Sequence, residues 1–304
     1  MPPDDTEDAA AKLRESPGAG TGAAHLLPLA LNATQKRLLE LTALWPWLTN
    51  ADLSGISGLP ESKVASELRW PVRQWLVEKR RVAGRLRITL SDRGLALLAR
   101  RDRVNVQGVL RQWSAASYDD GGHGVAGTRA RDLARHLGHT AAVYRFFAEL
   151  GRQARAQGGE LLLALPPHRA QRSYVTGGRV SHIKPDGYGH VKLHGGSVRF
   201  FLEWEQRAAH PAQFRAKLAA YLSYYRTGRA QDDYGAPPVL LVVLRDELVE
   251  SGFLSTALRL RTGQETPAVL ATYAELLRDD GPLGPIWRSE PGGGRTWLAL
   301  LKSP

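Results

Sequence analysis

"IKPDGYGHVKLHGGSVRFFLEWEQ", residues 183–206, reads as two β-strands on either side of a Gly-Gly turn at 195–196. Three carboxylates, Asp186, Glu203 and Glu205, interrupt this otherwise strand-like stretch. Carboxylates form strands poorly, and like charges that are crowded together raise the free energy of the folded state. Their presence here therefore predicts a functional site rather than a sheet with a purely structural role.

A two-residue turn at 195–196 predicts that Tyr188 pairs with Glu203 and that Asp186 pairs with Glu205. Because side chains alternate along a strand, the two glutamates share one face and Asp186 joins them there. Opposed residues on neighbouring strands stand ~5 Å apart. We therefore expect the three carboxylates to converge.

Carboxylates this close repel one another unless a positive charge lies between them. Mg²⁺ held by carboxylates and water would supply that charge, and so would a lysine or an arginine. Lys217 is the foremost candidate, because it lies on a predicted helix over 211–226 and shares a face with Phe214 and Tyr221. A lysine on an apolar face needs an acidic partner. Lys184 and Arg207 are weaker candidates.

The composition restricts the class of protein. The chain has 304 residues, no cysteine and a net charge of +11, so it has no disulfides or thiolate metal sites. Its apolar runs are too short for a membrane span and no signal peptide opens it, which predicts a cytoplasmic protein without membrane partners. The strong basic excess favours a polyanionic partner.

The N-terminal part predicts a winged helix-turn-helix. Three helical segments begin near Leu31, Thr49 and Pro60, Pro71 interrupts the third, and a basic two-stranded ribbon covers 79–90. In the ribbon, Leu86, Ile88 and Leu90 are expected to point inward while Arg85 and Arg87 point outward. Residues 63–103 carry twelve bases and four acids, a net charge of +8, so most of the chain's net positive charge falls in this one stretch. The predicted contacts to double-stranded DNA are Ser62, Lys63, Ser66, Arg69, Arg73, Arg80, Arg81, Arg85 and Arg87.

The chain divides into an acidic disordered tail (1–24), the winged helix (25–113), a Gly-rich linker (114–130) and a second domain (131–304). A long helix over 131–157 opens that domain, and the element order α-β-β-β-α-β predicts a mixed sheet flanked by helices, an α+β or α/β fold. After residue 250 we expect a helix at 267–278 and a last strand, "RTWLALL".

The motifs "KPDG", "FFLEWEQ", "KLAAYLSYY" and "PPVLLVVL" resemble, in this order, the PD-(D/E)XK nuclease superfamily. More narrowly, these motifs with "ITLSDRGLALLA" and "LGHTAAVYRFFAEL" resemble the plasmid replication-relaxation family, over about 31–244. The resemblance implies a winged helix joined to a nuclease-like domain, with a role in plasmid or mobile-element replication or in control of DNA topology. It also implies that acidic residues on adjacent strands hold Mg²⁺. The nuclease pattern has a lysine where this chain has Glu205.

Three functions remain open. The first is a DNA-binding protein with a degenerate nuclease-like domain, in which the acids form ion pairs with nearby cations. The second is an Mg²⁺-dependent endonuclease, in which Asp186 and Glu203 ligate the metal, Glu205 is a further ligand or base, and Lys217 replaces the missing lysine. The third is an adaptor whose winged helix binds replication or transfer proteins, and a homodimer is one candidate assembly.

Overall fold

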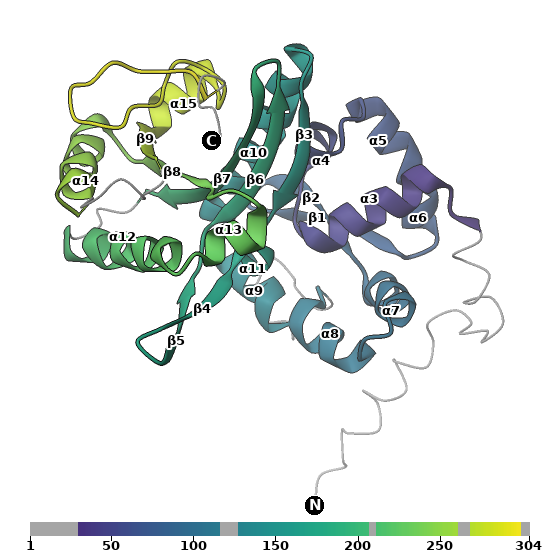
Figure 1. Cartoon of the computed structure of the whole chain (residues 1–304). Helices are drawn as coiled ribbons and strands as arrows, with labels where there is room; N and C mark the ends of the chain where they lie inside the picture. Colours follow the sequence, from purple (N-terminus) through teal and green to yellow (C-terminus); the bar gives the residue numbers. More distant parts are fainter. Residues whose placement is uncertain (1–29, 116–126, 207–210, 261–267, 299–304) are drawn as a thin grey trace, which may run out of the picture.

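A computed structural model describes residues 30–115, 127–206, 211–260 and 268–298 (Figure 1). The predicted acidic tail and most of the predicted linker lie outside the described residues. Within the described part of the chain, none of the helices combines the length and the apolar character that crossing a membrane requires.

The N-terminal part consists of short helices followed by a β-hairpin. In chain order the elements are α3 (Ala33–Leu44), α4 (Asn50–Ser57), α5 (Glu61–Glu67), α6 (Arg69–Arg73), β1 (Val77–Val82), β2 (Arg85–Leu90), α7 (Asp92–Arg101) and α8 (Val106–Trp113). Side chains cap these helices: Asn32 and Thr49 each form a capping box, and the hydroxyl of Ser91 accepts from the backbone of Gly94. The predicted third helix is divided into α5 and α6 at Leu68, three residues before Pro71.

The second part is built on a five-stranded mixed sheet in the order β3-β6-β7-β8-β9. Its strands are β3 (Glu160–Leu165), β6 (Gly187–Leu193), β7 (Gly196–Glu205), β8 (Val239–Leu244) and β9 (Val269–Tyr273). The first three pair antiparallel, whereas β7, β8 and β9 pair in parallel. The remaining elements are α9 (Thr128–Arg135), α10 (Leu137–Ala156), α11 (Pro167–Ala170), β4 (Arg172–Thr176), β5 (Arg179–Ile183), α12 (Pro211–Arg226), α13 (Arg229–Tyr234), α14 (Glu247–Leu260) and α15 (Ala274–Asp280). The predicted mixed sheet flanked by helices is confirmed.

The two faces of the sheet pack against different helices. Phe200 and Leu202 of β7 belong to a buried cluster that contains Phe146 and Phe147 of α10. Phe201, between them, belongs to a second cluster with the apolar residues of α12 and α14. This alternation is what the two-residue period of a strand dictates when both faces are covered.

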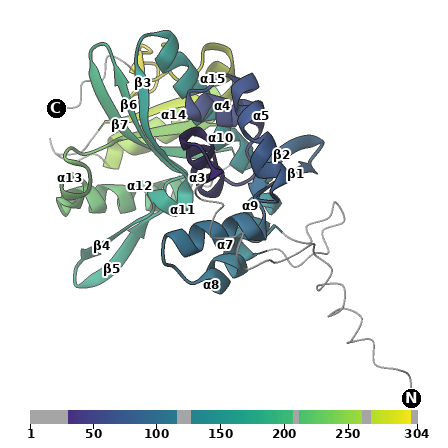
Figure 2. The same ribbon diagram turned by 90° about the vertical axis from the view of Figure 1, so that its right-hand side faces the viewer.

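The first cluster is continuous with the core of the N-terminal helices, because it also contains Leu38 of α3 and Leu53 of α4. Trp45 joins the two parts, with its ring 5.0 Å from that of Tyr144 and 5.3 Å from that of Phe147. Figure 2 shows α3 and α4 beside α10 and the sheet. One buried core therefore extends across both of the predicted domains.

A buried ion cluster holds the segment after α15 against α14. Glu250 is 0% exposed, and its Oε2 accepts from Arg288 at 2.6 Å and from Arg295 at 2.9 Å. Arg288 also pairs antiparallel with Ala271 of β9 through two backbone hydrogen bonds.

Several predictions about elements were wrong. The helix expected over 131–157 is two helices with a break at His136. The first half of the helix expected at 267–278 is β9, because this apolar run pairs in parallel with β8 and is buried. The hairpin β4–β5 and helix α14 had no predicted counterpart, and the described part of "RTWLALL" contributes an isolated bridge between Thr296 and Trp287.

Candidate functional site

The hairpin β6–β7 that carries the carboxylates has a different register from the predicted one. Leu193 pairs with Gly196 and Tyr188 pairs with Phe201, so the turn is His194-Gly195. Gly196 starts β7 with φ 138°, a backbone conformation that favours glycine. The predicted pairings of Tyr188 with Glu203 and of Asp186 with Glu205 were therefore wrong.

The register error is two residues, and a shift of two leaves every side chain on its predicted face. Continuing the observed register beyond Gly187 and Leu202 places Asp186 opposite Glu203. The backbone N–H of Asp186 donates to the carbonyl of Leu202 at 2.9 Å, which holds it beside β7. The expected approach of Asp186 to the glutamate strand is confirmed.

Glu203 is the buried member of the site, with 2% of its side chain exposed. Its Oε1 accepts from the hydroxyl of Tyr221 at 2.5 Å, and its Oε2 accepts from Nζ of Lys217 at 2.6 Å. Burial raises the pKa of Glu203 to about 7, while the charge of Lys217 acts in the opposite direction.

Lys217 reaches the carboxylates from α12, as its place between Phe214 and Tyr221 predicts. Besides Glu203, its Nζ lies 3.6 Å from Oε2 of Glu205, which is partly exposed. Burial would lower the pKa of Lys217, but the charges of Glu203, Asp186 and Glu205 outweigh burial and raise it. Lys217 therefore carries a positive charge between two of the three acids.

Asp186 is held by a different partner, His139 of α10. The Nε2 atom of His139 lies 3.0 Å from Oδ1 of Asp186, and Oδ2 accepts from the backbone N–H of Trp204 at 2.8 Å. Burial would raise the pKa of Asp186, but the hydrogen bond and charge of His139 lower it. The same hydrogen bond raises the pKa of His139.

The sequence analysis missed His139. It lies in "LGHTAAVYRFFAEL", but nothing in the spacing of that helix distinguishes it from the neighbouring His136. Only the crossing of α10 over the end of β7 brings it to Asp186.

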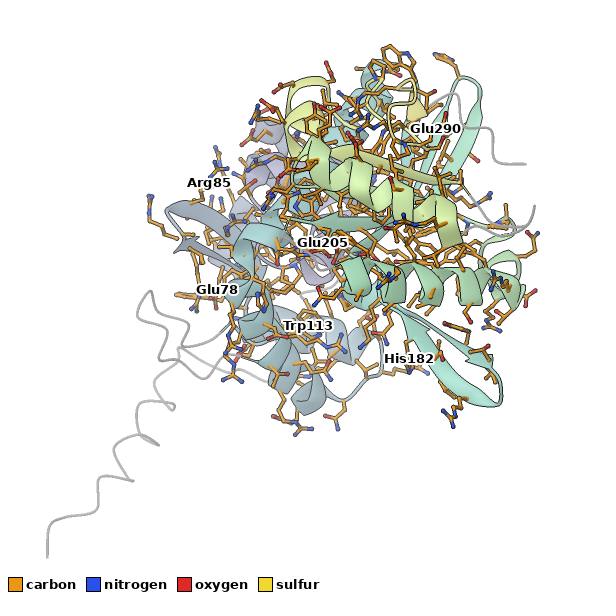
Figure 3. The ribbon with its side chains drawn as sticks, turned by 90° about the vertical axis from the view of Figure 1, so that its left-hand side faces the viewer. Glu78, Arg85, Trp113, His182, Glu205 and Glu290 are labelled. Atoms are coloured by element: carbon orange, nitrogen blue, oxygen red, sulfur yellow. The ribbon has the colours of Figure 1, made fainter. Side chains whose placement is uncertain are left out.

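Asp186, His139, Glu205 and Lys217 line one cleft of about 700 Å³ between the α9–α10 junction, the end of β7 and α12, and the buried Glu203 is not part of its lining. The lining includes His136, His139, Asp186, Trp204, Glu205, Gln206 and Lys217. Figure 3 labels Glu205 near the middle of the molecule in this view. Both cations of the site are paired with carboxylates: Lys217 with Glu203 and Glu205, and His139, whose pKa is raised, with Asp186.

The arrangement does not fit a Mg²⁺ site. Both oxygens of Glu203 and both of Asp186 accept hydrogen bonds from protein donors, and Lys217 bridges Glu203 to Glu205. Among the residues that the structure describes, no three His, Asp or Glu side chains are grouped so as to hold a metal ion. The lysine takes the position that the cation would need.

Most of the predicted DNA-contacting residues lie on the surface. Ser62, Lys63, Ser66, Arg69, Arg73, Arg81 and Arg85 are exposed on α5, α6 and the hairpin β1–β2. Arg80 is half-buried, with Nη2 2.6 Å from Glu78.

Arg87 was wrongly predicted to point outward. It is 4% exposed, its Nη1 donates to the carbonyl of Trp47 at 2.9 Å, and burial lowers its pKa. Leu86, expected to be buried, is 50% exposed. The strand β2 is covered on both faces from Arg87 to Leu90, so simple alternation does not apply to it.

Comparison with known proteins gives one family. A family model described as Replication-relaxation matches residues 69–240, more than half of the chain. No curated protein and no solved structure matches. The matched range includes α6, the hairpin β1–β2, all three acids and Lys217.

Proposed function

Because the chain belongs to the replication-relaxation family, we propose that it binds double-stranded DNA during replication or relaxation of a plasmid or mobile element. The family description supports a role in replication or relaxation, and the positive surface charge supports DNA as the ligand. The N-terminal helices and the hairpin β1–β2 would form a winged helix, and the second part would be a nuclease-like domain that no longer cleaves.

The arrangement of the N-terminal elements supports a winged helix. The helices α3 and α4 and the divided third helix α5–α6 precede a two-stranded hairpin, and Leu48 adds an antiparallel bridge to Ile88 of β2. The backbone N–H of Trp47 donates to the carbonyl of Ile88 at 2.9 Å, which holds this bridge against β2. A helix that enters the major groove beside a hairpin on the phosphate backbone is the usual geometry of such modules.

One observation carries the proposal: the exposed basic side chains gather on α5, α6 and the hairpin β1–β2. They are Lys63, Arg69, Arg73, Lys79, Arg81 and Arg85. Residues 63–103 hold twelve of the basic residues against four acidic ones. Clustered lysine and arginine bind phosphates by releasing counterions, which gives affinity without sequence readout.

The first prediction is that the full chain binds duplex DNA with an affinity that falls steeply with salt. Arg81→Ala/Arg85→Ala should make the slope of log K against log salt less steep by about two, because each removes a phosphate contact. Arg69→Ala, on the helix expected in the groove, should change the preference between sequences. Fluorescence anisotropy over a range of salt concentrations measures both effects.

The matched control is Arg215→Ala/Arg259→Ala, which removes two exposed arginines from α12 and α14. Salt-independent or absent binding of the intact chain would favour the adaptor, in which the winged helix binds a replication or transfer protein.

A metal-dependent nuclease is the second candidate. The observation that favours it is that Asp186, Glu205 and Lys217 line one cleft together with His139. The observation against it is that the oxygens of Glu203 and Asp186 already accept from protein donors. We therefore propose that Lys217 neutralises the acids and that the site is a scaffold.

The second prediction follows from this choice. The purified chain should not nick supercoiled plasmid in Mg²⁺ or Mn²⁺, and millimolar Mg²⁺ should not raise its melting temperature. Nicking that is lost in both Asp186→Ala and Lys217→Ala would establish the nuclease instead, since a contaminating nuclease would persist in these variants.

A further inference from the structure

The hairpin β4–β5, which we call the arm, forms a two-stranded sheet of its own. It pairs from Arg172 with Ile183 to Thr176 with Arg179. Gly177 and Gly178 close it with φ of 55° and 73°, as a tight hairpin turn requires. Figures 1 and 2 both show the arm extending from the body of the molecule.

The arm is anchored at its base. Tyr174 and Ile183 are 5% and 2% exposed and belong to the cluster under α12. The hydroxyl of Tyr174 donates to the carbonyl of Ala220 at 3.0 Å, and the guanidinium of Arg172 lies 5.1 Å from the ring centre of Tyr234. Because these contacts fix the orientation of the hairpin, a ligand would bind it without the entropic cost of ordering a mobile segment.

The outer face of the arm is exposed. Val175 and Val180 pair directly across the two strands and are 62% and 66% exposed. Ser173 and His182 pair on the same face, because alternate residues point to opposite sides of a strand. Tyr174 and Ile183 use the other face for the anchor.

The arm and its flanks carry only positive charge. Residues 161–185 contain no aspartate or glutamate, but contain Arg169, Arg172, Arg179, Lys184 and two histidines. Arg169, Arg179 and Lys184 are exposed. Two exposed valines are far too small an area for a stable protein interface, whereas a rigid basic ribbon complements a polyanion.

The arm also lies apart from the N-terminal hairpin. In Figure 3, His182 of the arm and Arg85 and Glu78 of β1–β2 lie on opposite sides of the view, with Glu205 between them. A duplex that touched both hairpins would therefore be contacted at two separate segments.

From these observations, and resting on the proposed DNA-binding function, we propose that the arm is a second contact with the same duplex. The major groove admits a two-stranded ribbon. Arg179 and Lys184 would contact phosphates at its borders, and Val175 and Val180 would face apolar base edges such as thymine methyl groups.

The test uses the full chain and three double variants: Arg179→Ala/Lys184→Ala, Val175→Ser/Val180→Ser, and the control Arg215→Ala/Arg259→Ala. We expect the first to weaken duplex binding by about tenfold and to make the salt slope less steep by about two. The valine variant should weaken binding at an unchanged salt slope. Hydroxyl-radical footprints of both should lose one protected segment that the wild type and the control retain.

The outcomes separate the two proposals. A wild-type chain that does not bind duplex DNA overturns both. A wild-type chain that binds, together with arm variants of unchanged affinity, slope and footprint, overturns the arm alone and leaves the N-terminal surface as the DNA contact. Arm variants that change only the sedimentation of the chain would assign the arm to self-association and also overturn the proposal. Melting temperatures confirm that each variant is folded.

Discussion

Glu203 and Lys217 show how one buried residue determines the chemistry of its neighbours. Removing a carboxylate from water costs several kcal/mol, and a cation in hydrogen-bonding contact offsets much of that cost. Both oxygens of Glu203 are satisfied, by Lys217 and by Tyr221. Without Lys217, the buried carboxylate of Glu203 would lose the cation that offsets its removal from water, and the folded state would be less stable.

Lys217→Met is expected to lower the free energy of unfolding at pH 8 by about 2–3 kcal/mol, below the usual loss for a broken buried pair because Lys217 is partly exposed. The effect should shrink towards pH 5. The pKa of the Glu203 carboxyl is about 7 in the folded protein and near 4.5 in the unfolded chain, so ionisation of Glu203 destabilises the fold progressively as the pH rises above 4.5. The lysine is therefore needed at pH 8, where Glu203 is charged, and matters less at pH 5, where the folded protein holds it protonated. Urea unfolding at pH 5 and pH 8 measures this difference.

Two variants control the experiment. Lys184→Met removes an exposed lysine and should leave stability nearly unchanged at both pH values. In the Glu203→Gln background, the loss of stability caused by Lys217→Met should be nearly the same at pH 5 and pH 8, because the carboxyl that titrates beside the lysine is gone. A loss of stability in Lys217→Met that is equal at pH 5 and pH 8 would mean that packing, not charge, explains it.

The sequence predicted part of this site and not the rest, for physical reasons. Strand alternation and helical spacing brought the three acids and Lys217 together, because both are local rules that do not depend on distant segments. His139 depends on how α10 crosses the sheet, which no local spacing encodes. Arg87 was misplaced because its strand is covered on both faces, and an arginine there donates to the backbone of Trp47.

At the scale of elements, caps and turns were predictable where one side chain satisfies the backbone. Thr49 caps α4, the helix that the sequence predicts to begin there, and Asn32 caps α3 next to the predicted start near Leu31. The turn of β6–β7 was misplaced by one residue, which shifted the register by two, since "LHGGS" allows more than one two-residue turn. Strand β9 was mistaken for helix because a fully buried parallel strand has no alternation to reveal it.

At the scale of the whole molecule, the N-terminal helices and the sheet share a core that the division at 113–131 does not predict. The contact is closest where α4 crosses α10. A Cβ added to Gly55 would lie 2.5 Å from the carbonyl oxygen of Ala148, and one added to Gly151 would lie 2.4 Å from the carbonyl oxygen of Gly55. Two glycines thus allow the two backbones to approach each other directly.

Gly55→Ala is therefore expected to lower the free energy of unfolding by about 1–3 kcal/mol, because the added methyl group overlaps backbone that cannot move aside. Gly252→Ala is the matched control: its Cβ would meet nothing within 4 Å on α14, so alanine should raise stability by up to about 1 kcal/mol. Urea unfolding of both variants measures the difference. If the two parts were independent, Gly55→Ala would affect only an early, separate transition. A single transition shifted as a whole would show that the α4–α10 contact couples the surface proposed to bind DNA to the carboxylate site.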